Sequence, residues 1–253
     1  MRPLITANFE SMGYSAVDFS IISDAAWAPG IETREAWQIW AQNEFPVGSG
    51  SEPPLRAMSP MQRRRLGLLG KMALEVAYEC LGGRSDVPII FCSRHGEASR
   101  SVDLLRDLAT GAPLSPTSFG LSVHNAIGGM FSIARKDHAN HIALSARQAT
   151  VEHAVIEACG LLADGEKAVL LVTYDYPLPE IYAGYRDGAE QPFAWAWLLE
   201  PPRDEVVSLS WSKTDEDAAN SLSGLEVLRF YLRKDGKLKR RCGGRLWQWI
   251  RNV

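Results

Sequence analysis

The sequence predicts an α/β protein with a layered, mostly parallel mixed sheet that carries helices on both faces. Three short runs of apolar residues indicate strands that are buried on both sides within such a sheet. These runs occupy residues 87–92, 141–145 and 168–172. Amphipathic segments of helical length separate them, and this alternation of helices with apolar strands is typical of an α/β fold.

The first part of the chain predicts one strand and two helices. Residues 17–22 alternate weakly between apolar and polar side chains, as a partly buried strand does. Residues 33–42 place their apolar side chains on one face of a helix. From Met61 to Cys80, apolar side chains recur at three- and four-residue steps until Gly82-Gly83, which predicts one long amphipathic helix.

Three more helices and a fourth strand are predicted in the middle of the chain. The helices cover residues 101–108, 123–134 and 149–163, and the second is predicted despite Gly128-Gly129 in its interior. Residues 193–199 form another apolar run. These elements complete the alternation on which the predicted fold class depends.

The composition and the predicted elements of the sequence change after residue 200. One strand is predicted at residues 206–211, and an amphipathic segment follows at 222–232. The basic, tryptophan-bearing tail at 234–251 favours a solvated amphipathic helix. We therefore predict one domain over residues 1–200 and a short C-terminal extension, a strand plus a basic helix, over residues 201–253.

Composition and charge exclude several classes of protein. A formal net charge of −3 gives no overall attraction to nucleic acid or to an anionic membrane. We expect a cytoplasmic protein, because no secretory signal and no membrane span is evident. We also expect no metal and no cofactor, since the cysteines lie far apart without a CxxC pair, as unpaired thiols in a reducing compartment do. They are Cys80, Cys92, Cys159 and Cys242.

A stretch from Leu114 to Tyr174 resembles the N-terminal half of the ketoacyl synthases, in the thiolase-fold superfamily. Ser115-Pro116 opens this stretch, and Asn125 followed by Gly128-Gly129 begins the next predicted helix. The apolar strand at 141–145 then runs directly into the helix near Gln148. The likeness extends more faintly over about residues 15–200, and it implies the N-terminal half of a thiolase-like fold.

The resemblance places glutamine at the position of the family's nucleophile. Active members carry a cysteine in an Ala-Cys-Ser/Ala/Thr motif at this junction, whereas this chain has Arg147-Gln148-Ala149. A carboxamide cannot form the thioester that condensation requires. Two departures from the family are a bulky Arg147 in place of alanine and Val151 in place of the glycine that often follows.

The family's remaining catalytic groups also lack counterparts. Active synthases take two histidines and a lysine from the second half of a duplicated fold, and this chain matches the first half only. None of the five histidines falls in a matching motif. They are His95, His124, His138, His141 and His153.

The resemblance therefore implies a catalytically inactive chain length factor, as in compact bacterial aryl polyene or type II polyketide systems. Its partner would be a full-length ketoacyl synthase, and an acyl carrier protein would be met mainly through that partner. A competing hypothesis is a malonyl-carrier-protein decarboxylase that uses Gln148. The residues are also compatible with an independent small-molecule binding domain, or with an unrelated protein in which Gln148 merely begins a helix.

Two groups of site residues follow from the resemblance. The strand before Gln148 would pair across the dimer axis, so we expect an interface formed by His141, Ile142, Ala143, Leu144, Ser145 and Asn125. A steric gate for the partner's acyl tunnel would be formed by Thr117, Ser118, Phe119, Met130 and Phe131. The apolar gate residues are also typical of an ordinary core. Ser93-Arg94-His95-Gly96, which follows a predicted strand, is either a ligand-binding turn or an ordinary loop. The basic tail at 234–251 could bind the acidic acyl carrier protein or contact a membrane surface.

Overall fold

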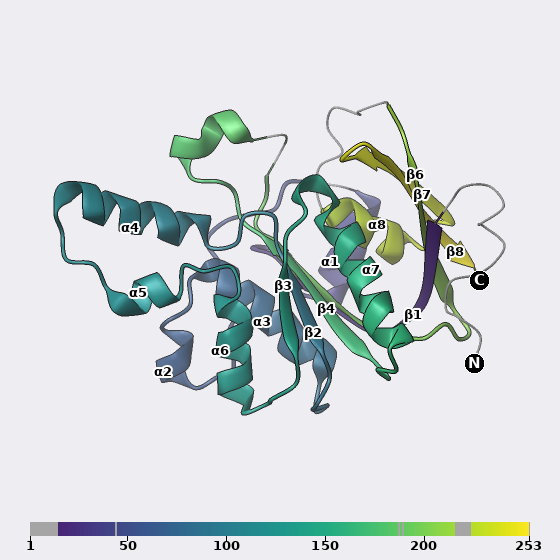
Figure 1. The fold of residues 1–253 in the computed structure, drawn as a ribbon, viewed down its shortest axis with the longest axis horizontal. Helices are drawn as coiled ribbons and strands as arrows, with labels where there is room; N and C mark the ends of the chain where they lie inside the picture. Colours follow the sequence, from purple (N-terminus) through teal and green to yellow (C-terminus); the bar gives the residue numbers. More distant parts are fainter. Residues whose placement is uncertain (1–14, 44, 187, 189, 216–223, 253) are drawn as a thin grey trace.

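One sheet runs through the molecule, with strand order β3-β2-β4-β5-β1-β6-β8-β7 (Figure 1). The computed structural model describes residues 15–43, 45–186, 188, 190–215 and 224–252. Its strands are β1 (Ser15–Trp27), β2 (Ile89–Cys92), β3 (His141–Leu144), β4 (Val169–Asp175), β5 (Phe193–Glu200), β6 (Val206–Lys213), β7 (Lys237–Cys242) and β8 (Arg245–Asn252).

The sheet is mixed, as the sequence predicts, but it is mostly antiparallel and not mostly parallel. Strand β2 pairs in parallel with β3 on one side and with β4 on the other. The other five pairings are antiparallel. Strand β3 therefore ends the sheet at one edge, next to the fully buried β2, and β7 ends it at the other.

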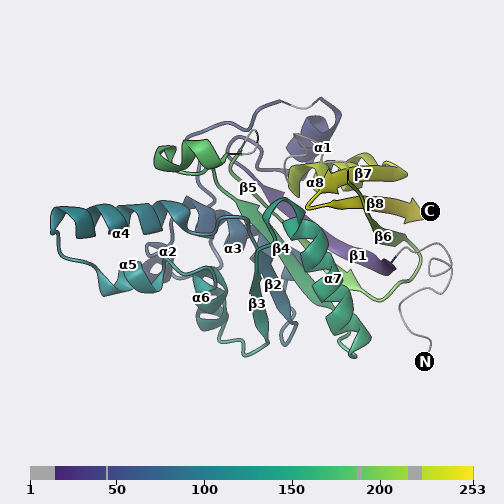
Figure 2. The ribbon, with the colours of Figure 1, turned by 45° about the horizontal axis from the view of Figure 1, so that its top comes forward.

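Helices cover both faces of this sheet (Figure 2). Helices α3 and α6 pack on one face, and α1, α7 and α8 pack on the other. The helices are α1 (Arg34–Gln42), α2 (Pro60–Arg63), α3 (Leu68–Leu81), α4 (Ala98–Thr110), α5 (Pro116–Gly120), α6 (Ala126–Arg135), α7 (Thr150–Ala163) and α8 (Gly224–Arg233), with short 3-10 turns η2 (Arg147–Ala149) and η3 (Glu180–Tyr185). Strand β4 alternates between the two cores, as a buried strand must.

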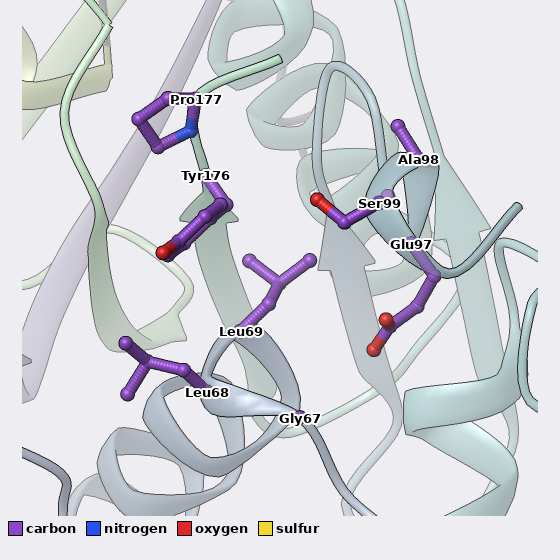
Figure 3. Close-up of a pocket in the computed structure, with 9 residues that line it drawn as sticks. Gly67, Leu68, Leu69, Glu97, Ala98, Ser99, Tyr176 and Pro177 are labelled. Carbon is purple, nitrogen blue, oxygen red and sulfur yellow. The ribbon is translucent and has the colours of Figure 1, made fainter. Parts of the chain in front are cut away.

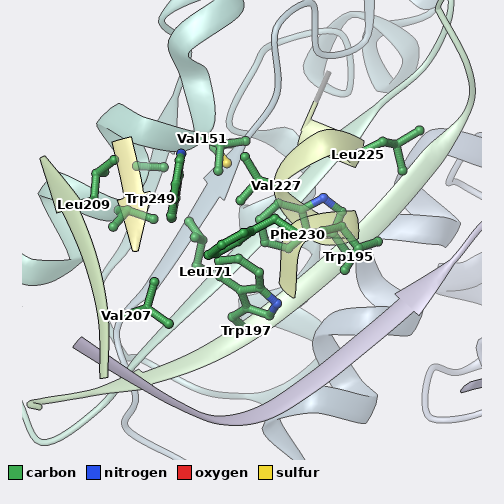
Figure 4. Packing of buried hydrophobic residues seen from close by; sticks show 14 of the residues in the cluster. Val151, Leu171, Trp195, Trp197, Val207, Leu209, Leu225, Val227, Phe230 and Trp249 are labelled. Atoms are coloured by element: carbon green, nitrogen blue, oxygen red, sulfur yellow. The ribbon is translucent and has the colours of Figure 1, made fainter. Parts of the chain in front are cut away.

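Helix α7 lies in a large aromatic core. Trp195 and Trp197 of β5, Phe230 of α8 and Trp249 of β8 meet beside it (Figure 4). Gly224 begins α8 at a close approach, because an added Cβ would lie 3.1 Å from the side chain of Val151. Strands β6, β7 and β8 thus belong to the same sheet as the earlier strands, and α8 with the β7–β8 hairpin covers the outer side of α7.

The long helix predicted from Met61 to Cys80 is wrong in its first part. The structure has a short α2, a break, and then α3 from Leu68. Ser59 caps α2 by accepting a hydrogen bond from Gln62 N, and Gly67 stands at the N-cap of α3. The apolar residues keep a helical spacing through the break at Gly67, so the spacing alone predicted one continuous helix.

The basic tail predicted as a solvated helix is also wrong. It forms the antiparallel hairpin β7–β8, closed by Gly243 and Gly244 at positive φ. Leu238, Arg240 and Cys242 alternate inward along β7, so its buried face contains an arginine. Because Arg240 is charged, the sequence of β7 does not show the alternation of apolar and polar residues that predicts a strand.

Candidate functional site

Strand β3 leads through a sharp turn into α7, and Gln148 lies at the centre of that turn, η2. The backbone of Arg147 has φ of 56°, a left-handed conformation that a non-glycine side chain rarely adopts. Thr150 closes the turn: its Oγ1 accepts from Ala146 N at 3.0 Å and donates to the Arg147 carbonyl oxygen at 2.6 Å. Gln148 is half-buried, and Arg147 is exposed. We call residues 145–149 the elbow.

A buried ion pair lies beneath the elbow. Arg240 of β7 donates to Glu152 of α7, and both side chains are almost completely buried. Arg240 also pairs with Glu226 of α8 at 3.0 Å and donates to the main-chain oxygen of Gln148 at 3.3 Å. Trp249 Nε1 donates to Glu152 at 3.4 Å. Burial opposes the charge of Arg240, but the neighbouring Glu152 raises the pKa of its guanidinium. The elbow and the C-terminal hairpin are thus joined through charged groups.

A second polar turn follows β2 at the same end of the sheet. Asp175, at the end of β4, accepts hydrogen bonds from Ser93 Oγ at 2.9 Å and from Arg94 N at 2.8 Å. Ser145 Oγ donates to the Arg94 carbonyl oxygen at 3.0 Å, which connects this turn to the elbow. Burial raises the pKa of the Asp175 carboxyl to about 6, although these hydrogen bonds oppose the shift.

A cleft of about 290 Å³ opens between the start of α3, the start of α4 and the segment after β4 (Figure 3). Leu69 lies between Tyr176 and Ser99 in this view, and the cleft wall also includes Glu97. Burial raises the pKa of Glu97, while nearby Arg100 lowers it. The cleft is on the α3 side of the sheet, and the elbow leads into α7 on the other side.

The described residues contain no group of three or more His, Cys, Asp or Glu side chains that could hold a metal ion. In this same part of the chain, no helix has both the length and the apolar character to cross a membrane.

The comparison with family models decides the family. The model described as beta-ketoacyl synthase, N-terminal domain, matches residues 37–250. This chain belongs to that family. The match crosses residue 200 and reaches β8, in agreement with the structural role of the C-terminal strands in the same sheet.

Solved structures of the β-ketoacyl synthase family have the same fold. One chain in the structure of the ketosynthase ApeO in complex with its chain length factor ApeC, from Xenorhabdus doucetiae, is 26% identical, with a TM-score of 0.80 over 92% of this chain and 99% of that one. The ishigamide ketosynthase/chain length factor is 14% identical, with a TM-score of 0.63 over 79% of this chain and 68% of that one.

A β-ketoacyl synthase from Burkholderia phymatum STM815 is 12% identical, with a TM-score of 0.57 over 73% and 59% of the two chains. The two matches below 25% identity show the fold alone. No curated protein matches this chain.

The five residues predicted to form a gate lie in two different environments. Thr117 and Phe119 of α5 are exposed, and Ser118 borders a second cavity next to the cleft. Met130 and Phe131 of α6 are buried in the core instead. The ring of Phe131 stacks edge-on against Tyr78 and Phe91. The structure therefore does not bring the α6 pair to the surface that carries the α5 residues.

The residues predicted to form the interface lie on the edge strand β3 and on nearby exposed positions. His141, Ile142, Ala143 and Leu144 form the edge strand β3, and all four are half-buried. Ser145 and Asn125 are exposed. Exposed apolar side chains also lie on the segments that lead to β3: they are Leu114, Phe119, Val123 and Ile133.

Sequence reasoning missed Arg240, Glu152 and Asp175. Glu152 had a recognisable signal, because it is an acidic residue one helical turn after Gln148 in a segment that is otherwise largely apolar. A carboxylate at a core position predicts a buried cationic partner. The identity of that partner, 88 residues later, needed the structure.

Proposed function

We propose that this chain is a chain length factor, a non-catalytic subunit that pairs with an active ketosynthase and helps to set product length in aryl polyene or related polyketide biosynthesis. The observation that carries the proposal is Gln148 in the turn between β3 and α7. This turn is where the family resemblance locates the nucleophilic cysteine. A neutral carboxamide cannot accept an acyl group as a thioester, so chemistry would belong to the partner.

The similarity to known complexes supports this role. The 26% identical chain belongs to a ketosynthase–chain length factor complex and is covered over 99% of its length. The two chains therefore share one fold over nearly the whole of the matched chain. A domain of this fold that carries glutamine in the elbow fits the non-catalytic member of such a pair.

The edge of the sheet supports pairing with a partner. Within the residues that the structure describes, strand β3 has a strand neighbour on one side only, and an unpaired edge is a ready template for another strand. Leu114, Phe119, Val123 and Ile133 add exposed apolar surface on the adjoining segments. We expect these features to be buried together in an obligate interface of about 2,000 Å² or more.

Chain length control would be steric in this proposal. Thr117 and Phe119 of α5 are exposed and Ser118 is half-buried, and in this proposal the three residues would close the partner's acyl tunnel. Met130 and Phe131 would act indirectly, through the core that supports α6. An acyl carrier protein would deliver substrate mainly to the partner.

Co-expression tests the proposed function. The chain would be produced with and without a full-length ketosynthase from the same organism, and the complex measured by size-exclusion chromatography with light scattering. We expect a stable one-to-one heterodimer. A soluble monomer that does not bind that synthase would contradict the proposal. Carbon dioxide release from malonyl carrier protein by the isolated chain, lost in Gln148→Ala, would instead favour a decarboxylase.

A further inference from the structure

Helix α7 is enclosed by two parts of the chain that are distant in sequence. Its inner side packs on β4 and β2, and its outer side meets α8 and the hairpin β7–β8. His153 of α7 stacks edge-on against Trp247 of β8, with ring centroids 5.2 Å apart. The hairpin therefore lies directly over the first turns of α7, next to the elbow.

Arg240 is the polar centre of this enclosed region. Only 1% of its side chain is exposed, and it contacts three separate elements: Glu152 of α7, Glu226 of α8 and the Gln148 carbonyl oxygen in η2. A guanidinium presents several donors in a fixed plane, whereas a lysine ammonium is a single point charge. The three contacts together therefore require arginine at this position.

The elbow needs external support. A non-glycine residue such as Arg147, at a φ of 56°, remains in that conformation only where surrounding contacts hold it. Thr150 supplies local contacts through Ala146 and the Arg147 carbonyl oxygen. Arg240 supplies the long-range contact, since it binds both the elbow backbone and the first turn of α7.

We infer that Arg240 is a positioning residue that holds the elbow in the shape presented to the partner subunit, a role that rests on the proposed function. The elbow begins at Ser145, directly after the edge strand β3, and Ser145 and Arg147 are exposed there. The C-terminal hairpin would thus shape the expected interface through its contact with the elbow. The contact acts through the main chain, so it does not depend on the glutamine side chain.

The test compares Arg240→Lys with Arg251→Lys. Lysine at position 240 keeps the charge opposite Glu152 but cannot also reach the elbow carbonyl. Arg251 is a matched control on the neighbouring strand β8, where it donates to the Tyr231 carbonyl oxygen and pairs with Glu205, away from the elbow. Hydrogen exchange of the Ala146 and Ala149 amides, both hydrogen-bonded within the elbow, reports its order directly.

For Arg240→Lys we expect about tenfold faster exchange of those two amides and about tenfold weaker binding to the synthase. Exchange in β4 and β5 should stay unchanged, and Arg251→Lys should leave the elbow amides and the affinity unchanged. If Arg240→Lys does not fold, the neutral pair Glu152→Gln with Arg240→Gln takes its place. Unchanged elbow exchange, or an increase shared equally by β4 and β5, would overturn the inference.

The exchange measurement needs no partner, so it separates the two proposals. Wild-type chain that binds no synthase would refute the proposed function, whatever the elbow does. Normal binding of both variants, together with selective loosening of the elbow in Arg240→Lys, would show that the elbow's shape does not matter to the partner. That result would overturn this inference and leave the proposed function intact.

Discussion

Arg240 donates a hydrogen bond to the main-chain oxygen of Gln148 over 3.3 Å, although 92 residues separate the two in sequence. This contact joins the last hairpin of the chain to the turn that precedes α7. The strand order likewise places β6, β7 and β8 in the same sheet as the strands before residue 200. The elbow and its supporting hairpin should respond together to mutation.

The two adjacent glycines of α6 are predicted to respond oppositely to alanine. A Cβ added at Gly128 would lie 2.7 Å from the His141 ring and 3.2 Å from the Phe91 ring, whereas Gly129 has nothing within 4 Å. Gly128→Ala should therefore lower the free energy of unfolding by about 1–3 kcal/mol through overpacking. Gly129→Ala should raise it by about 0.5–1 kcal/mol, because alanine favours the helix. Urea denaturation of both variants checks this prediction, and shifts in the same direction would contradict it.

Much of this fold could be predicted from the sequence. Strands β2, β3 and β4 are short apolar runs because helices cover the sheet on both faces. The helices between them in sequence predicted that these strands pair in parallel, and they do. The edge position of β3 came from the family resemblance. Strand β7 could not be predicted from its sequence pattern. Its buried face contains the charged Arg240 where an apolar residue would be expected, so the alternation typical of a strand is not visible.

The candidate site was predictable only in part, for the same physical reason. Gln148 could be found from its neighbours in sequence, because a strand, a turn and a helix follow one another there. Arg240 could not be found in this way, since its partners are distant in sequence. The α6 pair Met130 and Phe131 looked equally suited to a gate or a core, and only the structure shows that they are core residues.

A charge on the expected interface should prevent pairing with the synthase. Val123 is 46% exposed, next to the segment that leads into α6, and we predict that Val123→Arg weakens the complex by tenfold or more, about 1.4 kcal/mol. Ile39, on α1, is 59% exposed and gives a matched control, because Ile39→Arg adds the same charge elsewhere. Isothermal titration with the purified synthase measures both. Equal losses of affinity would show that the contact surface lies elsewhere.

A larger side chain on α5 should shorten the product of the pair. Ser118 is half-buried beside α4, and Ser118→Trp would add bulk where the partner's tunnel is expected to end. Overpacking of about 1–3 kcal/mol is enough to shift the preferred length by one elongation step. Mass spectrometry of the products checks this result, with Lys213→Trp, on exposed β6 surface, as the control for bulk alone. Unchanged product length would remove Ser118 from the gate.

The buried carboxyl of Asp175 predicts a specific pH dependence of stability. Its pKa is raised by burial to about 6 in the folded protein, above the ordinary value of 3.8, so the folded state binds the proton more tightly than the unfolded state. The free energy of unfolding should therefore fall as pH rises from about 4 to 6, by up to about 3 kcal/mol. Asp175→Asn cannot titrate at this position and should lose this contribution. Urea denaturation at pH 4.5 and pH 7 compares the two proteins, and equal pH dependence would contradict the prediction.

The most direct test of the central claim is intact-protein mass spectrometry of the complex after incubation with an acyl carrier protein that bears a labelled acyl thioester. We expect the label to appear on the synthase partner, while this chain keeps its unmodified mass. Acyl transfer to this chain, with or without the partner present, would contradict the claim that it is a non-catalytic subunit.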